Sequence, residues 1–358
     1  MAEWAAYSCD AITGDQIDRI PFSAFSYARA LSAGGDGQVS VPLDGTFERG
    51  YLRSLLQPLS RMLVLERDGA VEYMGTVAHP PTYVRGQAQV TVQLEDVWAR
   101  FARRGGWGHS APNVEKWKTT VSGSLRDHAV AAIRRGRDDG PVLPVMAMPI
   151  TLPGGEGGSI SRTYYGYHIE MVGDVLQDLL DEGLDIYFQP RWLARGDSDW
   201  LMRAGVEWSS GVTRDFYVTA ERSEVTGFSV SGDASRVTNN ARNVGEGSEV
   251  DMLVRSQRNV DSPYPLLDRV TQMKQVSDVS QLSALSHQDL RMYAEPTIQN
   301  EFSVLGDSPI DVGDTARLHF DGDPWVPDGW QTTRVVKVAV KLPGPDVKTI
   351  SVQPMGGA

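Results

Sequence analysis

The chain has 358 residues, of which 41% are hydrophobic and 22% are charged; this is typical of a folded protein and excludes a disordered one. It is too long for one ordinary hydrophobic core, so we expect roughly two to four domains. The formal net charge of -12 argues against a protein that holds nucleic acid through phosphate contacts. Cys9 is the only cysteine, which excludes an intrachain disulfide and a thiolate metal site.

Neither a membrane segment nor an export signal is expected. No stretch approaches the ~20 apolar residues that a helix needs to span a bilayer. The start of the sequence, MAEWAAYSCDAITGD, lacks a basic head followed by an apolar block, so we expect no signal peptide. Assembly in a reducing compartment fits the cysteine usage.

Residues 1-105 are predicted to form a first strand-rich module. Its clearest element is a β-hairpin over Val64 to Val77, because alternating apolar residues flank Asp68-Gly69 and a tight turn needs positive φ at its centre. Leu55-Leu56 lies in a connector before this hairpin. Other strands are predicted over 20–31, 39–43 and 89–96. Short strands with a period of two indicate a small antiparallel barrel.

Residues 106-214 are predicted to form a mixed α/β insertion domain that opens with a helix. The helix covers 122–136, with Ser122 or Ser124 as N-cap and Gly136 as the stop. Apolar residues recur at helical spacing along it, so one face should be buried.

The second half of this domain begins with a loop and ends in strands. The segment 149–166 is predicted to be an exposed loop because it is rich in Gly and Pro, and the sequence leaves open whether residues 153–162 order only on assembly. A helix follows over 168–183, with Gly183 at its C′ position. Two strands, 184–190 and 199–206, complete the domain.

The rest of the chain is predicted to contain strands with one linking helix, over 215-295, and then a second barrel module, over 296-358. The helix begins at Asp278 and ends before Pro296. The closing strands are expected at 298–305, 314–320, 332–342 and 346–354. The predicted fold is therefore α+β and β-rich, with two small antiparallel β-barrel modules at the chain ends flanking a mixed α/β middle.

No catalytic, cofactor or metal residues are assigned from motifs. Six histidines occur singly, and none has a second histidine at i+3, i+4 or i+5, so helical zinc spacing is absent. No Gly-x-Ser-x-Gly elbow is present, and the glycine-rich GGEGGS lacks the Lys-Ser/Thr that completes a phosphate-binding loop. The histidines are His79, His109, His128, His168, His287 and His319.

The stretch FDGDPWVPDG brings Asp321, Asp323 and Asp328 close together in sequence. Calcium prefers several oxygen ligands in a tight loop, so an ion site is one interpretation. No Glu follows at the position that an EF-hand requires, and a solvated loop between strands is the favoured interpretation.

Several motifs together resemble the tail hub proteins, or minor tail proteins, of long-tailed (siphovirus-type) phages that infect actinobacteria, which are related to the baseplate hub and tail-associated family. The opening strand has Thr13-Gly14 and then Pro21-Phe22, followed by the Gly34 to Gly37 loop and the Leu65 to Val77 hairpin. Downstream, VGDVLQDLLDEGLDIYFQP resembles the family's helix and strand. IDVGDTARLHF, with Gly313-Asp314, then TTRVVKVAV and KTISVQP resemble its closing barrel.

This resemblance implies a structural virion component without enzymatic activity. It implies a homotrimer whose barrels form a ring that joins the six-fold tail tube to the three-fold tip and lines part of the DNA channel. The implied partners are the distal tail protein, the tape measure protein and other tail-tip proteins. The chain would assemble in the host bacterial cytoplasm and serve host cell attachment and genome ejection, and its acidic balance would let DNA pass without stable binding.

Two other classes of function stay open at this point. A cell-wall hydrolase is disfavoured because no metal cluster or activated nucleophile is evident. A receptor- or glycan-binding tip protein is suggested by 9 Trp and 12 Tyr, although buried core aromatics are the commoner outcome.

Overall fold

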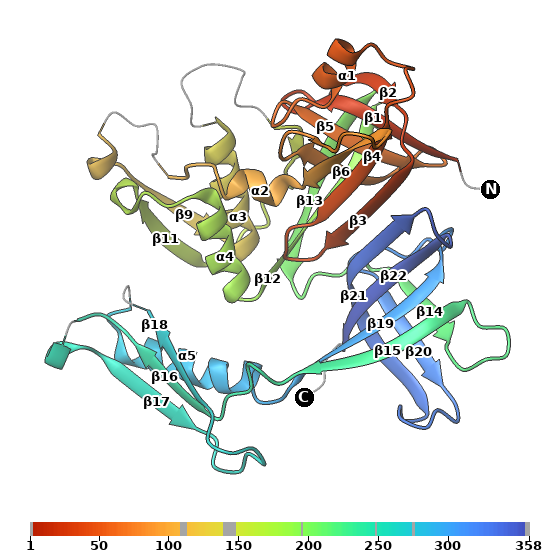
Figure 1. Cartoon of the computed structure of the whole chain (residues 1–358). Helices are drawn as coiled ribbons and strands as arrows, with labels where there is room; N and C mark the ends of the chain where they lie inside the picture. The colour runs from red at the N-terminus through yellow and green to blue at the C-terminus, as the bar shows by residue number, and fades with distance from the viewer. Residues whose placement is uncertain are drawn as a thin grey trace. The chain divides into compact units, whose positions relative to one another are not determined.

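A computed structural model describes residues 3–107, 113–138, 148–194, 196–247, 249–273 and 276–354. The chain divides into two compact units, Met1–Gly227 with Phe302–Ala358, and Phe228–Glu301. Strands outnumber helices among the described elements (Figure 1), so the predicted β-rich, antiparallel character is confirmed. None of the described helices combines the length and the apolar character needed to cross a bilayer.

The first unit is built on one large sheet. Among the described residues this sheet has 14 strands in the order β15-β19-β22-β21-β3-β4-β8-β6-β5-β1-β2, with β7, β14 and β20 paired beside that path. Its N-terminal strand set is β1 Trp4–Asp10, β2 Gln16–Ile20, β3 Ala24–Ala30, β4 Asp36–Pro42, β5 Arg61–Arg67, β6 Ala70–Val77, β7 Thr82–Tyr83 and β8 Gln89–Glu95. Its C-terminal strand set is β14 Thr213–Tyr217, β15 Val225–Asp233, β19 Thr297–Leu305, β20 Thr315–Phe320, β21 Gly329–Leu342 and β22 Val347–Pro354. Residues 228–233 of β15 and 297–301 of β19 belong to the second unit.

The predicted hairpin is confirmed as β5 and β6. Asp68 and Gly69 have φ values of 49° and 87°, the positive values that a tight turn between twisted strands requires. The strands run antiparallel, with Leu65 opposite Tyr73. The sequence pattern therefore identified both the strands and the turn.

Strand β5 is buried on both of its faces. Met62 and Val64 belong to one hydrophobic cluster, and Leu63 and Leu65 belong to the other. All four are fully buried. Because successive side chains point to opposite faces of a sheet, this strand lies between two cores, which explains its continuous apolar run.

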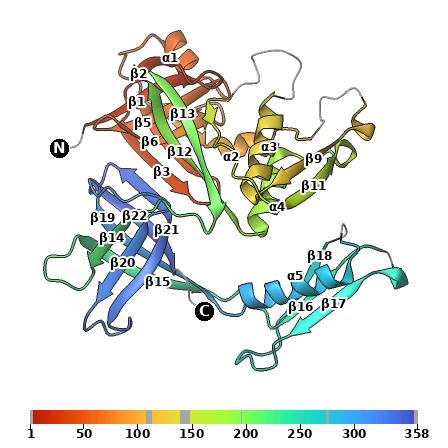
Figure 2. The ribbon, with the colours of Figure 1, turned by 180° about the vertical axis from the view of Figure 1, so that it is seen from behind.

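The middle segment adds helices and a long hairpin to this unit. The remaining elements of the first unit are α1 Arg49–Leu55, α2 Val97–Phe101, η1 Val114–Lys116, β9 Lys118–Gly123, α3 Leu125–Asp138, β10 Ile150–Thr151, β11 Ile160–Tyr165, η3 Gly166–His168, α4 Val172–Asp181, β12 Leu184–Ala194 and β13 Asp197–Val206. Seen from behind, the β12–β13 hairpin lies over the N-terminal strand set (Figure 2). The amide of Ser32 donates to the carbonyl of Ile186 at 2.8 Å, which ties this hairpin to the sheet.

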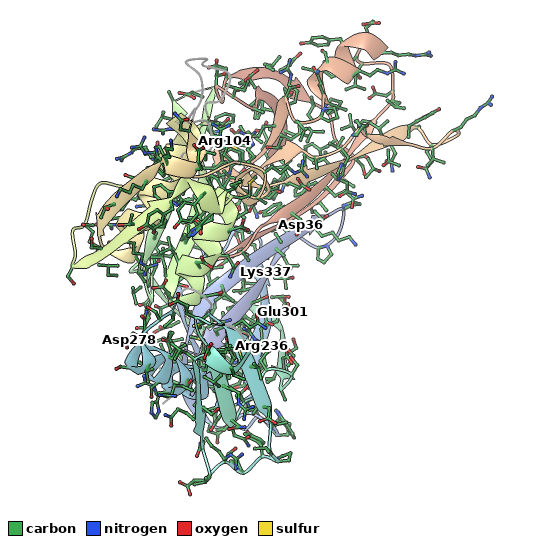
Figure 3. All side chains as sticks on the ribbon, turned by 90° about the vertical axis from the view of Figure 1, so that its left-hand side faces the viewer. Asp36, Arg104, Arg236, Asp278, Glu301 and Lys337 are labelled. Carbon is green, nitrogen blue, oxygen red and sulfur yellow. The ribbon has the colours of Figure 1, made fainter. Side chains whose placement is uncertain are left out.

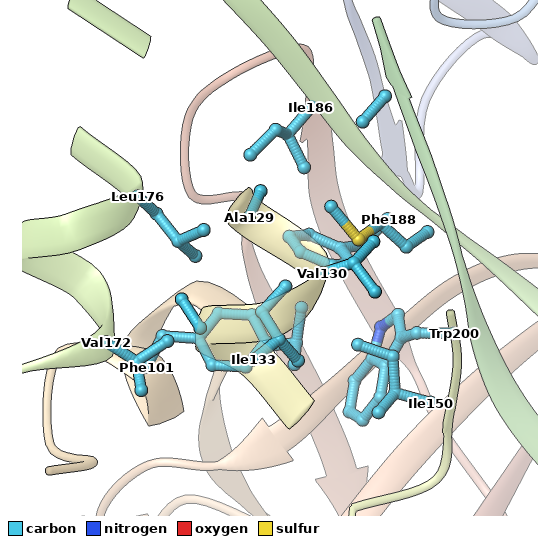
Figure 4. Packing of buried hydrophobic residues seen from close by; sticks show 14 of the residues in the cluster. Phe101, Ala129, Val130, Ile133, Ile150, Val172, Leu176, Ile186, Phe188 and Trp200 are labelled. Carbon is cyan, nitrogen blue, oxygen red and sulfur yellow. The ribbon is translucent and has the colours of Figure 1, made fainter. Parts of the chain in front are cut away.

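The larger core is shared by α3, α4 and the β12–β13 hairpin (Figure 4). Ile133 of α3 and Leu176 of α4 pack with Phe188 and Trp200 of the hairpin. The helical stripes predicted from sequence are therefore the buried faces, and both predicted helices are confirmed.

Local signals place most helix ends correctly. Ser124 is the cap of α3, since its hydroxyl accepts from the amide of Asp127 at 3.3 Å and the Asp127 carboxylate accepts from the amide of Ser124 at 3.0 Å. Gly183, with φ 97°, follows the end of α4 as predicted. The prediction that Gly136 stops α3 is wrong, because the helix runs to Asp138. A Cβ on Gly136 would overlap Val172 of α4, so this glycine allows close packing of the helices.

Two further expectations are corrected by the structure. The predicted loop over 149–166 contains β10, which pairs in parallel with β13, and β11, which pairs antiparallel with β9 over Ile160–Tyr165. The connector with Leu55-Leu56 contains α1, which buries Leu52 and Leu55 on one face. In both cases the segment is short and is flanked by turn-forming residues, so its amphipathic pattern was too brief to predict a helix or strand.

The predicted closing strands are confirmed as β19 to β22. Strand β21 pairs with β20, β22 and also with β3 of the N-terminal strand set. Because the described order does not return to its first strand, closure of either strand set into a barrel stays a prediction.

The second unit, Phe228–Glu301, is a small sheet covered by a helix. Asp278 caps the helix by accepting from the amide of Gln281 at 2.8 Å, and Leu282 is fully buried, as the prediction of a helix from Asp278 requires. Tyr293 lies under the guanidinium groups of Arg236 and Arg269. Its elements are β16 Asn240–Val244, η4 Glu249–Asp251, β17 Val254–Arg258, β18 Asp268–Gln272 and α5 Val279–Met292.

Gly313 and Gly211 offer a matched test of the close approach before β20. Both have positive φ, 85° and 80°. A Cβ on Gly313 would overlap the ring of Trp208, whereas a Cβ on Gly211 would meet no atom within 4 Å apart from its chain neighbours. We expect Gly211→Ala to lower the free energy of unfolding by about 1 kcal/mol through backbone strain. Gly313→Ala should lower it by roughly 2 kcal/mol more through overpacking. Equal losses in urea unfolding would contradict the contact with Trp208.

Candidate structural site at the junction of the two strand sets

A ladder of backbone hydrogen bonds joins the N- and C-terminal strand sets. We use the term junction for this ladder and the side chains around it. Strand β3 pairs antiparallel with β21 from Ala30–Lys337 to Phe25–Leu342. The amide of Leu31 extends the pairing by donating to the carbonyl of Val336 at 2.8 Å. Segments from opposite ends of the chain thus form one continuous sheet.

A buried cluster of four charges lies behind this ladder. Arg29 of β3 contacts Glu72 of β6 and Asp311, each at 3.2 Å. Lys348 of β22 contacts Glu72 at 3.3 Å and donates to the carbonyl of Ser308 at 3.1 Å. The side chains of Arg29, Glu72 and Lys348 are only 7%, 12% and 6% exposed. The cluster holds two positive and two negative groups, so it is balanced when all four are charged.

Two tyrosines complete the hydrogen bonds of this cluster. Tyr27 donates its hydroxyl to Glu72 at 3.0 Å. Tyr187 of β12 accepts from Arg29 at 3.3 Å and donates to Asp311 at 3.4 Å. The middle segment is therefore attached to the same cluster as both strand sets, because Tyr187 comes from the β12–β13 hairpin.

The environment keeps Glu72 ionised. Burial alone raises the pKa of this carboxyl, but Arg29, Lys348 and the hydroxyl of Tyr27 outweigh it and hold the pKa below its usual range. Burial raises the pKa of Tyr27, and Glu72 raises it further, so its hydroxyl stays a donor. Because the folded pKa of Glu72 is depressed, its contribution to stability is present above about pH 4.3 and is lost as pH falls through the folded pKa.

Ion pairs at the edge of the junction also connect different segments of the chain. Arg67 of β5 binds both carboxylate oxygens of Asp346, at 3.2 and 2.8 Å. Arg334 of β21 binds Asp185 of β12 at 2.5 Å. The Arg67–Asp346 pair is bidentate, which fixes orientation as well as distance between the strand sets, whereas Arg334 ties β21 to the β12–β13 hairpin through a single contact.

A second carboxyl beside the junction is held in an unusual state. Asp96 caps α2 by accepting from the amide of Trp98 at 2.9 Å, and it also accepts from the amide of Gly35 at 2.5 Å. Burial raises its pKa to about 7, with smaller contributions from Asp36 and Glu95, although the two amide hydrogen bonds act in the opposite direction. It lines a cavity of about 20 Å³ that also touches Arg29, a volume suited to one water and not to a substrate.

The Asp-rich loop over 321–328 forms turns instead of gathering its carboxylates. Asp323 accepts from the amides of Trp325 and Val326, at 2.8 and 2.7 Å, and Asp328 accepts from the amide of Gly322 at 2.7 Å. Asp321 uses its own amide to bond Thr219. Across the described ranges, no group of three or more His, Cys, Asp or Glu side chains is placed to hold a metal ion.

The histidines are dispersed in the structure as they are in the sequence. His128 is buried beside Tyr164 and the carbonyl of Ile160, and burial lowers its pKa. His168 lies 3.8 Å from Glu170, and His319 packs with Tyr217 and Trp330. His109 lies outside the described residues.

Sequence reasoning missed the junction residues. Arg29, Glu72 and Lys348 lie in strands whose charged residues are expected on a solvated face, and no spacing connects them. The one available signal was the alternation in β3 and β22, which places Arg29 and Lys348 on the same parity as the buried Tyr27 and Ile350.

The fold as a whole is shared with solved tail proteins, among them one of a prophage. The 43 kDa tail protein of prophage MuSo2 from Shewanella oneidensis superposes with a TM-score of 0.61 and 9% identity, covering 99% of this chain and 98% of that one. The tail protein from Neisseria meningitidis MC58 gives 0.59 and 13%, covering 99% and 97%.

An Escherichia coli component of the type VI secretion system, itself structurally similar to the bacteriophage T4 tail proteins gp27 and gp5, gives a TM-score of 0.50 and 11% identity, covering 94% of this chain and 74% of that one. No protein-family model and no curated protein matches the sequence. At these identities the likeness concerns the fold.

Glu72→Ala should strongly destabilise the protein, because it leaves Arg29 and Lys348 buried without their shared partner. We expect the free energy of unfolding to fall by about 3–5 kcal/mol, measured by urea unfolding. The control is Glu3→Ala, which removes an exposed pair with Arg19 at 3.8 Å, with side chains 79% and 57% exposed. That change should stay within about 1 kcal/mol. A loss as small for Glu72→Ala would refute the role of the cluster.

Asp96→Asn should change the pH dependence of stability. Because the folded pKa is raised to about 7, Asp96 contributes stability that is complete below about pH 4 and is lost as pH rises through 7. The melting temperature of Asp96→Asn relative to the unmodified chain should therefore rise between pH 5 and pH 8. Asp44→Asn is the control. Hydrogen bonds from Thr46 lower the pKa of Asp44, so this carboxyl does not titrate between pH 5 and pH 8. A flat difference for Asp96→Asn would contradict the assignment.

Proposed function

We propose that this chain is a structural hub of a phage tail tip, which joins the six-fold tail tube to the three-fold tip and forms part of the DNA channel. The observation that carries this proposal is the shared fold with phage tail proteins over 99% of the chain. The sequence motifs, from the Thr13-Gly14 opening to Gly313-Asp314, support the same assignment and favour a long-tailed phage of actinobacteria.

Within this role the chain acts as a homotrimer. Each copy contributes its N-terminal and C-terminal strand sets, closed as barrel modules, to a ring of six. The modules cover 1-105 and 296-358, and the second also takes in β14 and β15 from the preceding segment. Between them 106-214 is an inserted α/β domain and 215-295 supplies strands and the linking helix. The junction supports this arrangement, because the β3–β21 ladder and its buried charges hold the two strand sets of one copy together.

The proposed hub has no enzymatic activity and takes no cofactor. Its partners are further copies of itself, the distal tail protein, the tape measure protein and other tail-tip proteins. The net charge of -12 favours passage of DNA through the channel without stable binding, because like charges repel phosphate. The chain would be assembled in the host cytoplasm and reside in the virion.

The direct test is to locate the chain in the particle that carries it. We expect cryo-electron microscopy of purified tails, with a tagged copy as marker, to place three copies at the tip end of the tube. The purified chain should leave host cell wall intact in a zymogram. Absence of the tag from tails would reject the hub, and clearing of the cell wall would replace it with the hydrolase.

A further inference from the structure

The loop over 321–328 presents one tryptophan to solvent on a braced support. Trp325 is 84% exposed, whereas its neighbour Val326 is buried. Asp323 accepts from the amides of both residues, and Asp328 bonds back to Gly322. A loop whose backbone is braced by hydrogen bonds loses little backbone entropy on binding, so this loop is suited to enter a partner surface.

A groove lies on the outer face of the junction. It has a volume of about 540 Å³ and is lined by β3, β21 and β22. Ala28 and Ala339 are paired across the ladder on its floor, which leaves room for a large side chain. Lys337 and Lys341 are exposed along it, and among the described residues neither has an ion-pair partner (Figure 3, where Lys337 is labelled). One carboxylate, Asp36, also contributes to the lining.

We propose that the 321–328 loop of one copy docks in this groove of a neighbouring copy, with Trp325 above the alanines and the loop carboxylates facing Lys337 and Lys341. Shape and charge are complementary, since an acidic loop with a large ring meets a basic groove with a small-residue floor. The inference rests on the proposed homotrimer and identifies the surfaces through which its copies meet.

The 321–328 loop cannot dock in the groove of its own copy, because the two surfaces lie too far apart. The loop precedes β21 and the groove lies near the far end of the same strand, so Trp330 and Ala339 are separated by about 30 Å of extended chain. A contact between two different surfaces is heterologous, and it closes into a ring when the rotation permits. This is the geometry that a three-fold assembly needs.

An aromatic cluster beside the loop extends the docking surface. Tyr217, His319 and Trp330 lie side by side on β14, β20 and β21, with ring centroids 4.9 to 5.5 Å apart. Arg317 stacks on Trp330 at 4.8 Å. Tyr, Trp and Arg are the residues enriched at the energetic centres of protein interfaces, which favours a protein partner for this face.

The first test measures the mass of the full chain and its variants by light scattering across a dilution series. We expect a trimer for the unmodified chain. Trp325→Ala and the double charge reversal Lys337→Glu with Lys341→Glu should each weaken assembly by about 30-fold or more, as truncation of an interface centre does. Tyr167→Ala is the matched control, because that ring is also exposed but lies on η3, and it should leave the mass unchanged.

A mixture of the Trp325→Ala variant and the charge-reversed variant tests whether the loop and the groove bind each other. A Trp325→Ala copy keeps an intact groove and a charge-reversed copy keeps an intact loop, so an equal mixture should form one good contact per pair and accumulate heterodimers. Trimers that persist in both variants would overturn this inference and leave the hub proposal standing. An unmodified chain that stays monomeric at every concentration would also overturn it, while the location of the tagged chain in tails decides the hub proposal separately.

Zero-length coupling of amines to carboxylates gives an independent readout. A carbodiimide takes up the water released as an amide forms between a lysine and an aspartate. In an equal mixture of isotopically light and heavy chains, we expect mixed-isotope links between the 321–328 loop and Lys337 or Lys341. Links only within one isotope would reject the docking between copies. Links from the loop to a different protein in purified tails, without links between copies, would assign the surface to that protein instead.

Discussion

The architecture depends on the pairing of β3 with β21, because this one ladder joins the two ends of the chain into a single sheet. Four balanced charges and two tyrosines lie behind it, so the ladder is fixed in register and orientation. The middle segment from α2 to β13 can then be understood as an addition to a frame that the two strand sets build. A buried ion cluster is a weak source of net stability but a strong source of specificity, since any other register would leave its charges unpaired.

The sequence predicted the elements that local chemistry specifies. Asp68-Gly69 gave the turn, Gly183 the end of α4, and Asp278 the start of α5, because each acts on backbone groups within a few residues. It did not predict the junction, because Arg29 and Lys348 resemble surface charges until tertiary pairing buries them. The sequence also wrongly predicted that Gly136 ends α3. A glycine is needed there because Val172 approaches closely.

The two cores meet along β5 and its neighbours β1 and β6, and this has a consequence for how the parts of the first unit behave. Met62 and Val64 face the helices of the middle segment, whereas Leu63 and Leu65 face the other core. A change in one core is therefore transmitted to the other through these three adjacent strands, because close-packed interiors have little free volume to absorb a shift. The inserted helices and the N-terminal strand set therefore share their packing and belong to the same compact unit.

The junction also imposes an order on biosynthesis. Strand β3 leaves the ribosome long before β21, and until β21 is made, one edge of β3 carries unpaired backbone groups that can pair with any other open strand. A ladder between such distant segments forms slowly, since the intervening chain must be brought to closure first. The nascent protein must therefore keep this edge unoccupied through most of its synthesis, and premature pairing with another chain at β3 is the misfolding route to which this topology is most exposed.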